Sequence, residues 1–319
     1  MANILITTRS VASCATAVSM LQQAGHSIKV QIGVGDMPEE VMAGLVAGVD
    51  ALIVGVDRVT RRVVEAGTPT LKIIARNGVG YNNVDLDAAA EHGVAVTVAP
   101  GASAVSVAEL ALGLMLTLSR SIACQNQCIQ SGGWERPMGT ELYGRTLGIL
   151  GVGTIGSEVA RRARALGMNV LACDILPNHT FAAQVGFPYV PLEELLQGSD
   201  ILTLHVPATP ETRGIIGRAA LARMRPGTLL INTARGELVD EHAVRGAILS
   251  GVLGGYAADT LLREPPLPGD PLLGLDRVVL TPHCGAYTRQ AVERCGIMVA
   301  EEVLRVLCGE APRHPVVRH

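Results

Sequence analysis

The chain has 319 residues, of which 48% are hydrophobic and 17% charged. This length corresponds to about two domains of roughly 150 residues and excludes a small single module, while the composition excludes a disordered chain and a coiled coil. The net charge of −3 leaves no basic excess to neutralise phosphates, so we expect no nucleic-acid partner. Aromatic residues make up only 3% of the chain, so the cores must be built from Val, Leu, Ile and Ala, as in buried parallel sheets.

The chain starts with Met1-Ala2-Asn3 and passes directly into a strand-like segment, which predicts no signal peptide. The best apolar run, 105–118, contains Glu109 and is too short to cross a bilayer, so no membrane partner is expected. The seven cysteines are scattered and include no CxxC pair. We therefore expect no metal site and a reducing, cytoplasmic location.

Strand-like and helix-like segments alternate along the whole chain, which predicts an α/β protein with parallel sheets. The first series ends at about residue 98 and makes a complete small α/β unit. Its strands are expected at 4–7, 28–31, 51–54, 71–75 and 94–98, and its helices around 11–24, 38–47, 60–66 and 85–91.

A predominantly apolar helix is expected at 104–119, with Ser103 as its N-cap. The next segment, 120–145, has less clear periodicity and is interpreted as an arm. A second, larger sheet follows, and the last apolar-periodic stretch, 288–308, is expected to be a helix. The strands of this second sheet are expected at 146–150, 169–173, 201–206, 228–232, 255–258 and 278–281.

The segment Gly151-Val-Gly153-Thr-Ile-Gly156 has the pattern G-x-G-x-x-G, follows a predicted strand and opens a predicted helix at 157–166. In this context Gly151 permits a tight turn, Gly153 lets backbone amides approach a pyrophosphate, and Gly156 lets the helix pack closely on the strand. The partial positive charge at the helix N-terminus favours the phosphates. The alternative is a glycine-rich turn without a ligand.

Asp174 ends the next strand, 23 residues after Gly151, where a carboxylate accepts hydrogen bonds from the ribose hydroxyls of a dinucleotide. A carboxylate repels a 2′-phosphate, and the following Ile175-Leu176-Pro177 supplies no arginine to attract one. The sequence therefore predicts NAD rather than NADP as the cofactor.

Three candidate catalytic residues follow strands of the second sheet: Arg235 in Asn232-Thr-Ala-Arg-Gly, Glu264 in Arg263-Glu-Pro-Pro, and His283 in Thr281-Pro-His-Cys-Gly. Arg235 can bind a carboxylate through two parallel N–H bonds. His283 can take the proton of a hydroxyl on oxidation and return it on reduction. Glu264 can fix the tautomer of the histidine and favour its imidazolium form. Each alone could be structural or a surface charge; beside a dinucleotide site they predict a shared catalytic role.

With these motifs in order, the sequence resembles the D-isomer-specific 2-hydroxyacid dehydrogenases, and within them the phosphoglycerate dehydrogenase group, over nearly its whole length. The resemblance implies two doubly wound parallel-sheet domains: a Rossmann NAD-binding domain, 99–283, inserted into a flavodoxin-like substrate domain, 1–98 and 284–319, with the active site in the cleft. It also implies a dimerisation arm at 120–145 and therefore a homodimer. Further markers are Ser106-Val-Ala-Glu109, Trp134-Glu-Arg, Met138-Gly-Thr-Glu-Leu142 and His205-Val-Pro207.

The resemblance assigns binding residues as well. For the substrate it implies Asn77, Gly78, Val79 and Gly80 with Arg235 and His283, the amides of Val79 and Gly80 helping Arg235 to hold the carboxylate. Val107 and Asp259 would lie near the nicotinamide, and Thr212 near the cofactor phosphates. The full set expected at the cofactor is Val107, Gly151, Gly153, Thr154, Ile155, Gly156, Asp174, His205, Val206, Pro207, Thr212, Thr233, Ala234, Arg235, Asp259, His283 and Gly285.

The chain departs from the phosphoglycerate dehydrogenase pattern near the expected substrate. Where those enzymes commonly have Arg-Ser, this chain has Val54-Gly55, which removes a cation for a phosphate. Arg58 and Arg76 remain and either attract a second anionic group or are structural. The common Asp-Val-Phe is Asp259-Thr260-Leu261 here, so the loop that carries Glu264 can shape the pocket differently.

The expected function is an NAD-dependent dehydrogenase that interconverts a small D-2-hydroxy acid and its 2-oxo acid by hydride transfer. Candidate substrates are 3-phosphoglycerate, glyoxylate or hydroxypyruvate, and another compact acid with a distal phosphonate or sulfonate. A formate-type dehydrogenase is one alternative, although such enzymes pair the histidine with glutamine rather than a residue like Glu264. The other is an NAD(H)-sensing, corepressor-like binding protein, which would be expected to carry long flexible extensions.

Overall fold

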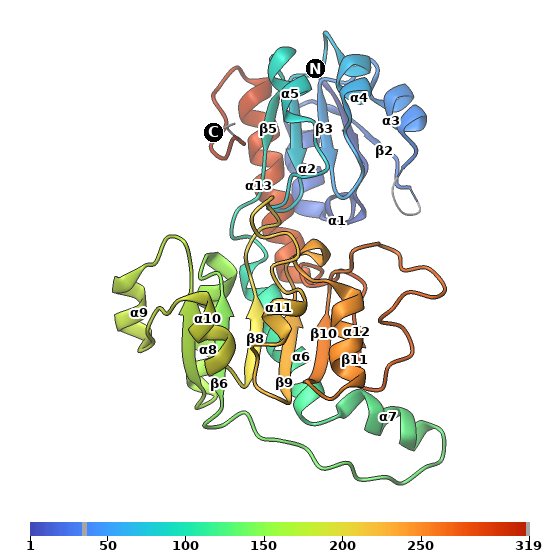
Figure 1. Cartoon of the computed structure of the whole chain (residues 1–319). Helices are drawn as coiled ribbons and strands as arrows, with labels where there is room; N and C mark the ends of the chain where they lie inside the picture. The colour runs from blue at the N-terminus through green and yellow to red at the C-terminus, as the bar shows by residue number, and fades with distance from the viewer. Residues whose placement is uncertain (34–36, 317–319) are drawn as a thin grey trace. The chain divides into compact units, whose positions relative to one another are not determined.

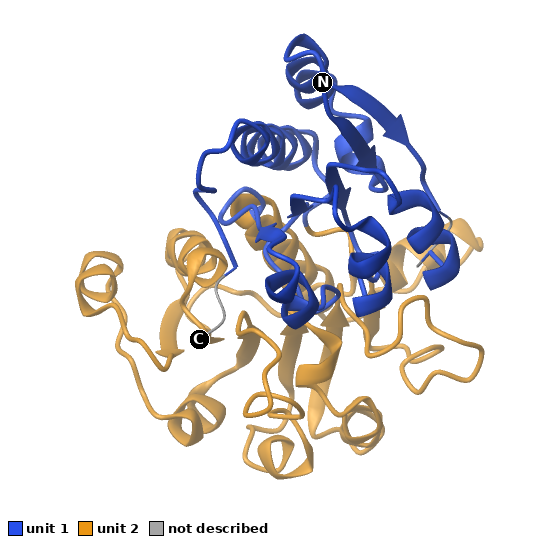
Figure 2. Ribbon diagram, turned by 90° about the horizontal axis from the view of Figure 1, so that it is seen from above, with its two compact units in different colours: residues 1–103, 286–319 blue, residues 104–285 orange. Residues whose placement is uncertain are grey.

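The computed structural model describes residues 1–33 and 37–316, and the chain divides into two compact units (Figures 1 and 2). Unit 1 comprises Met1–Ser103 and Ala286–His319, and unit 2 comprises Ala104–Gly285. Both unit boundaries lie a few residues further along the chain than the domain boundaries expected from the sequence. Residues 317–319 of the expected substrate domain lie outside the described residues.

Unit 1 contains a five-stranded parallel sheet in the order β2-β1-β3-β4-β5, which is the flavodoxin-like order. Ile4 of β1 pairs with Ile28 on one side and Ala51 on the other. Successive side chains point to opposite faces, so Leu5 and Ile6 lie in different cores. The strands are β1 (Asn3–Ile6), β2 (Ser27–Val30), β3 (Ala51–Val54), β4 (Ile73–Arg76) and β5 (Ala95–Thr97).

Within the described residues, helices cover both faces of the unit 1 sheet. One face is covered by α1 (Arg9–Ala12), α2 (Ala15–Gln23) and α13 (Arg289–Leu307), and the other by α3 (Glu39–Val46), α4 (Arg61–Gly67) and α5 (Leu86–Glu91). The single helix expected at 11–24 is interrupted, because the Ser13 hydroxyl donates to the Ser10 carbonyl at 3.0 Å and so competes with the helical backbone pattern.

Unit 2 contains a six-stranded parallel sheet in the order β11-β10-β9-β8-β6-β7. Tyr189 makes a parallel bridge to Ala172 of β7, and counting this bridge as a third outer strand gives the common Rossmann order. The expected fold class of two doubly wound parallel sheets is therefore confirmed. The strands are β6 (Thr146–Leu150), β7 (Asn169–Cys173), β8 (Ile201–Leu204), β9 (Thr228–Asn232), β10 (Leu253–Ala258) and β11 (Val278–Leu280).

Helices cover both faces of the unit 2 sheet as well. One face is covered by α6 (Ala104–Ser119), α8 (Thr154–Ala165) and α9 (His179–Val185), and the other by α10 (Leu192–Gly198), α11 (Arg218–Leu221) and α12 (Glu241–Leu249). The apolar helix expected at 104–119 is α6. A short 3₁₀ turn, η1 (Gly236–Leu238), precedes α12.

The arm expected at 120–145 contains a helix, α7 (Ile122–Gln130), that the sequence pattern did not indicate. None of its side chains is buried, so no apolar periodicity marks it. In the described part of the chain no single helix is long and apolar enough to span a membrane, and α6 and α7 meet that criterion only together, as a pair bent by 64°.

The strand order of unit 2 reverses between β6 and β8, whose chain continuations after their carboxyl ends are Gly151 and His205. Open α/β sheets bind their ligands at such a reversal. The glycine-rich segment predicted from the sequence therefore lies at the end of the sheet where folds of this type bind their ligands.

Candidate active site

Arg235 follows β9 in a turn that the buried Asn232 side chain stabilises by hydrogen bonds to the backbone. Asn232 is fully buried, and its side-chain oxygen accepts from the Ala234 amide at 3.0 Å while its side-chain nitrogen donates to the Arg235 carbonyl at 2.8 Å. The role of Asn232 was not predicted from the sequence, although an Asn at the end of a strand is the signal for such a side-chain turn. One guanidinium nitrogen of Arg235 donates to the Ala234 carbonyl at 2.7 Å. Because Arg235 forms no ion pair with a carboxylate of the described residues, its other N–H groups can bind an anion.

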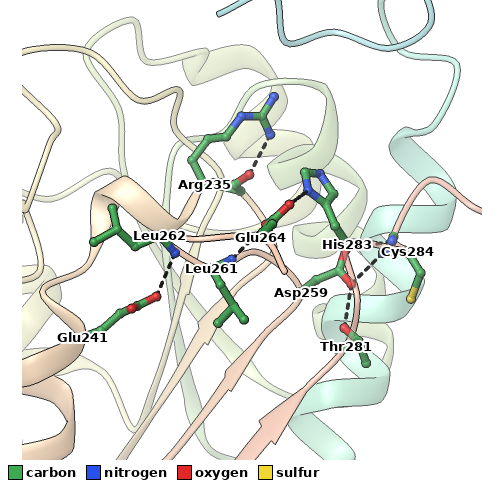
Figure 3. A network of polar contacts seen from close by, with 11 residues as sticks. Arg235, Glu241, Asp259, Leu261, Leu262, Glu264, Thr281, His283 and Cys284 are labelled. Carbon is green, nitrogen blue, oxygen red and sulfur yellow. Dashed lines mark hydrogen bonds and ion pairs between the residues drawn. The ribbon is translucent and has the colours of Figure 1, made fainter. Parts of the chain in front are cut away.

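Glu264 and His283 form a hydrogen-bonded pair, with 2.7 Å between Glu264 Oε2 and His283 Nδ1 (Figure 3). Burial alone would raise the pKa of Glu264, but the hydrogen bond and charge of His283, the Leu261 amide and the charge of Arg235 outweigh burial and lower that pKa. Glu264 is therefore ionised near neutral pH and accepts from Nδ1–H. This leaves Nε2 of His283 as the ring nitrogen that can exchange a proton.

The loop that carries His283 is held by Asp259. His283 has a φ of 51°, a left-handed conformation that is uncommon for a residue with a side chain. Its amide donates to the Asp259 carbonyl at 2.8 Å. The buried Asp259 carboxylate accepts from the Thr281 hydroxyl at 2.6 Å and from the amides of Cys284 and Gly285 at 2.9 and 2.7 Å. Asp259 therefore stabilises the conformation of this loop. Its expected place near the nicotinamide stays a prediction.

Val107 of α6 packs beside the same loop. It is buried, and its Cγ2 would lie 3.4 Å from a Cβ atom added to Gly285. The Cys284 thiol is half-buried there, and burial together with the negative charge of Asp259 raises its pKa. The thiol next to His283 therefore stays protonated and is a poor nucleophile.

All seven cysteines are free thiols. Across residues 1–33 and 37–316, no group of three His, Cys, Asp or Glu side chains is arranged to hold a metal ion.

The glycine-rich loop has the tight packing that its spacing predicts. Gly151 has a φ of 93°, and a Cβ atom on it would lie 2.9 Å from the His205 carbonyl. A Cβ atom on Gly156 would lie 2.1 Å from the Gly151 carbonyl oxygen. Gly153 is the exposed N-cap of α8 and offers no side-chain acceptor, so the first amides of that helix can bind a phosphate. Thr154 and Ile155 form the first turn of α8.

Asp174 follows β7 and binds the glycine-rich loop directly. Its Oδ2 accepts from the Val152 amide at 2.6 Å and its Oδ1 from the Leu176 amide at 2.8 Å. Since a carboxylate has about four acceptor positions, Asp174 keeps capacity for ribose hydroxyls. The bond to the Val152 amide also anchors the glycine-rich loop, a role of Asp174 that was not predicted from the sequence.

Two buried polar atoms near the ends of β8 and β9 have no hydrogen-bond partner among the described residues: His205 Nδ1 and Thr233 Oγ1. His205 Nε2 lies 2.9 Å from Thr203 Oγ1, and burial lowers the pKa of His205 to about 3, so its ring is neutral. The Thr212 hydroxyl donates to the Pro207 carbonyl at 2.6 Å. A dinucleotide fits this set of groups: the unpartnered atoms of His205 and Thr233, the open N-terminus of α8 and the acceptor oxygens of Asp174. Val206, Pro207 and Ala234 lie in the same two turns.

The four residues expected at the substrate, Asn77 to Gly80, follow β4 in unit 1. The Asn77 side chain donates to Ser10 Oγ at 2.6 Å, and the Gly78 carbonyl accepts from the Ala99 amide at 2.8 Å. Val79 is exposed. Their role in substrate binding stays a prediction.

The sequence of residues 112–285 matches the family model of the D-isomer specific 2-hydroxyacid dehydrogenase NAD binding domain. The chain belongs to this family, and its cofactor is NAD. It is 44% identical over 268 residues to a hydroxypyruvate reductase of Thermotoga maritima, in an alignment that covers 82% of this chain and 86% of the relative.

A D-3-phosphoglycerate dehydrogenase of Archaeoglobus fulgidus is 40% identical over 303 residues. This alignment covers 94% of this chain but only 57% of that enzyme, so the chain spans little more than half its length. Among solved structures, the TT0316 protein from Thermus thermophilus has a TM-score of 0.91 and 37% identity, with 99% of this chain and 100% of the other covered.

Proposed function

We propose that this chain is an NAD-dependent dehydrogenase that interconverts a small D-2-hydroxy acid and its 2-oxo acid. The 2.7 Å contact between Glu264 and His283, within the NAD-binding part of the chain, carries the proposal. When bound, NAD supplies the hydride acceptor or donor for C2 of the acid. The protein must then bind the acid's carboxylate and move the hydroxyl proton.

The side chains described above perform these two tasks. Arg235 binds the substrate carboxylate through the guanidinium N–H groups that do not bond Ala234. Nε2 of His283 accepts the hydroxyl proton on oxidation and returns it on reduction. Ionised Glu264 stabilises the imidazolium that forms.

The pairing with a carboxylate favours this reaction over a formate-type dehydrogenase. Oxidation of formate releases no hydroxyl proton, so it gives no reason to place an ionised carboxylate on the imidazole. Val54 lies fully buried at the end of β3, so no side-chain cation is available there for a phosphate. Compact acids without a phosphate, such as glyoxylate or hydroxypyruvate, are therefore candidate substrates as well as 3-phosphoglycerate.

The test is NADH oxidation by the purified chain with a panel of 2-oxo acids that carry neutral, carboxylate, phosphate or sulfonate tails. At least one acid should be reduced, and His283→Ala should lower that rate by about 10² to 10⁴-fold. Tight NADH binding with no turnover of any acid, together with stable protein partners in a pull-down, would instead support the corepressor-like alternative.

We further propose a homodimer formed through the arm. Trp134 and Met138 of the arm are 75% and 96% exposed, and Ile122 and Ile129 of α7 are each 50% exposed. A cavity of about 820 Å³ lies between the arm and the amino ends of β9, β10 and β11. Trp134→Asp with Met138→Asp should convert the dimer to monomers in sedimentation experiments, whereas a monomeric parent chain would refute the proposal.

We also propose that the protein is cytoplasmic, where its seven free thiols stay reduced. Alkylation of intact cells followed by mass measurement should find these thiols unoxidised; recovery of the protein in an oxidising compartment would contradict this.

A further inference from the structure

The loop after β10 brings Glu264 to His283, yet it has little packing of its own. Between the buried Leu261 and the buried Leu272, residues 262–271 include no buried residue. Leu262 is 58% exposed. Glu264 uses one carboxylate oxygen to accept from the Leu261 amide at 2.9 Å and the other to bind His283. The position of this carboxylate therefore depends on what holds the backbone at 261–262.

Glu241, the first residue of α12, holds that backbone. Its side chain enters the protein rather than solvent, since the residue is only 6% exposed, and its Oε1 accepts from the Leu262 amide at 2.8 Å (Figure 3). Burial raises the pKa of Glu241, as does the nearby charge of Asp270. The N-cap of α12 is Asp240, whose side chain accepts from the Ala243 amide at 3.0 Å. Glu241 is thus not needed to cap its own helix.

The same backbone touches the turn that carries Arg235. A Cβ atom on Gly236 would lie 2.1 Å from the Leu261 carbonyl carbon and 2.3 Å from the Leu262 nitrogen. The Leu261–Leu262 peptide is therefore held both by its close contact with Gly236 and by the bond to Glu241. This arrangement joins the loop of Glu264 to the turn of Arg235.

We propose that Glu241 is a positioning residue for the proton-transfer pair: its bond to the Leu262 amide keeps Glu264 on Nδ1 of His283 and so keeps Nε2 available. The proposal rests on the proposed dehydrogenase function. In this proposal Glu241 acts through the loop backbone, by its bond to the Leu262 amide. An acidic residue in the first turn of a helix is common because it favours the helix dipole, so its sequence position does not reveal this task.

The first test needs no turnover. Ring ¹⁵N spectra of the histidine-labelled full chain, with His283 assigned from its loss in His283→Gln, show which ring nitrogen carries the proton. The parent should show the Nδ1–H form. Glu241→Leu, which cannot accept from Leu262, should shift the His283 signals toward a mixture of tautomers. Glu241→Gln keeps an acceptor oxygen and should give the parental spectrum.

A matched control is Glu194→Leu, which removes an exposed first-turn glutamate from α10 instead of the buried one from α12. It should leave the His283 signals unchanged. A Glu241→Leu protein that is folded by circular dichroism and keeps the parental His283 signals would overturn the proposal, as would a Glu241→Gln protein that behaves like Glu241→Leu.

The second test is a double-mutant cycle with the best acid from the panel. Glu241→Leu should lower kcat tenfold or more, since a misplacement of about 1 Å can cost about 10²-fold, and should change KM for NADH little. In the Glu264→Gln background the same substitution should have less than about a twofold effect, because the carboxylate it positions is gone. Additive losses would overturn the proposal. If the parent reduces no acid, the proposed function fails, while the spectra still decide the role of Glu241.

Discussion

Asp259 and His283 are joined through both the backbone and the loop between them: the Asp259 carbonyl accepts the His283 amide at 2.8 Å, and the Asp259 carboxylate accepts the next two amides in the chain. The aspartate is 2% exposed, so water cannot replace it. The uncommon φ of His283 persists because these bonds determine the backbone around it.

Asp259→Ala should therefore destabilise the protein. The substitution leaves the buried Gly285 amide and the part-buried Cys284 amide and Thr281 hydroxyl without their acceptor, and each unsatisfied buried group costs about 1–3 kcal/mol, not fully additively. We expect a loss of about 2 kcal/mol or more in the free energy of unfolding by urea at pH 7. Asp259→Asn keeps one acceptor oxygen and should lose less; an Ala variant as stable as the parent would show that these bonds contribute nothing net.

The contribution of Glu264 to the stability of the protein should depend on pH. Its pKa is lower in the folded protein than its ordinary value, so it stabilises the fold at pH values above that ordinary value and loses this contribution as the pH falls through the folded pKa. Glu264→Gln does not titrate and should be less stable than the parent at pH 7, with the difference disappearing as the pH falls below about 4. The gain is modest because the side chain is 37% exposed. Thermal unfolding of both proteins from pH 3 to 8 measures it; parallel curves would contradict it.

The same substitution should slow the reaction. Without the Glu264 carboxylate, Nδ1 of His283 loses its charged hydrogen-bond partner, so the ring is no longer held with Nε2 available for proton transfer. We expect kcat for the best acid of the panel to fall about tenfold or more. Steady-state rates at pH 7 test this, with Glu194→Gln on the exposed first turn of α10 as the control; an unchanged kcat would contradict the role of the pair.

The strands were predictable because they are short buried apolar runs between polar segments, and Ala51–Val54 is found at the predicted residues. Arg235, Glu264 and His283 could be proposed as catalytic residues from the sequence because each follows a strand within a local motif, and the structure confirms the contact between the last two. Glu241 was not predictable, since nothing in the sequence around it indicates that it reaches an amide 21 positions away. α7 was missed for a related reason, because a helix that buries no side chain carries no periodic pattern.

Replacing Thr260 by valine should raise the free energy of unfolding. The residue is 2% exposed and its hydroxyl has no hydrogen-bond partner among the described residues. Thr260→Val replaces the hydroxyl by a methyl group of similar volume, so unfolding in urea should require about 1 kcal/mol more. Thr281→Val is the matched comparison, because the Thr281 hydroxyl donates to Asp259 at 2.6 Å, and it should lose about 1 kcal/mol or more. Equal effects of the two substitutions would contradict this account.

Replacing Gly156 by alanine should weaken NADH binding. A Cβ atom there would lie 2.1 Å from the Gly151 carbonyl oxygen, so Gly156→Ala must move the start of α8 away from the strand-to-helix turn. The displaced amides can no longer meet the phosphates together, and we expect the Kd for NADH, measured by fluorescence titration, to rise at least tenfold, with about 1–3 kcal/mol of lost stability. Gly113→Ala in α6 is the control: a Cβ atom there meets nothing within 4 Å, so the variant should gain about 0.5–1 kcal/mol and bind NADH like the parent. Unchanged NADH affinity in Gly156→Ala would show that the cofactor phosphates do not bind at this helix.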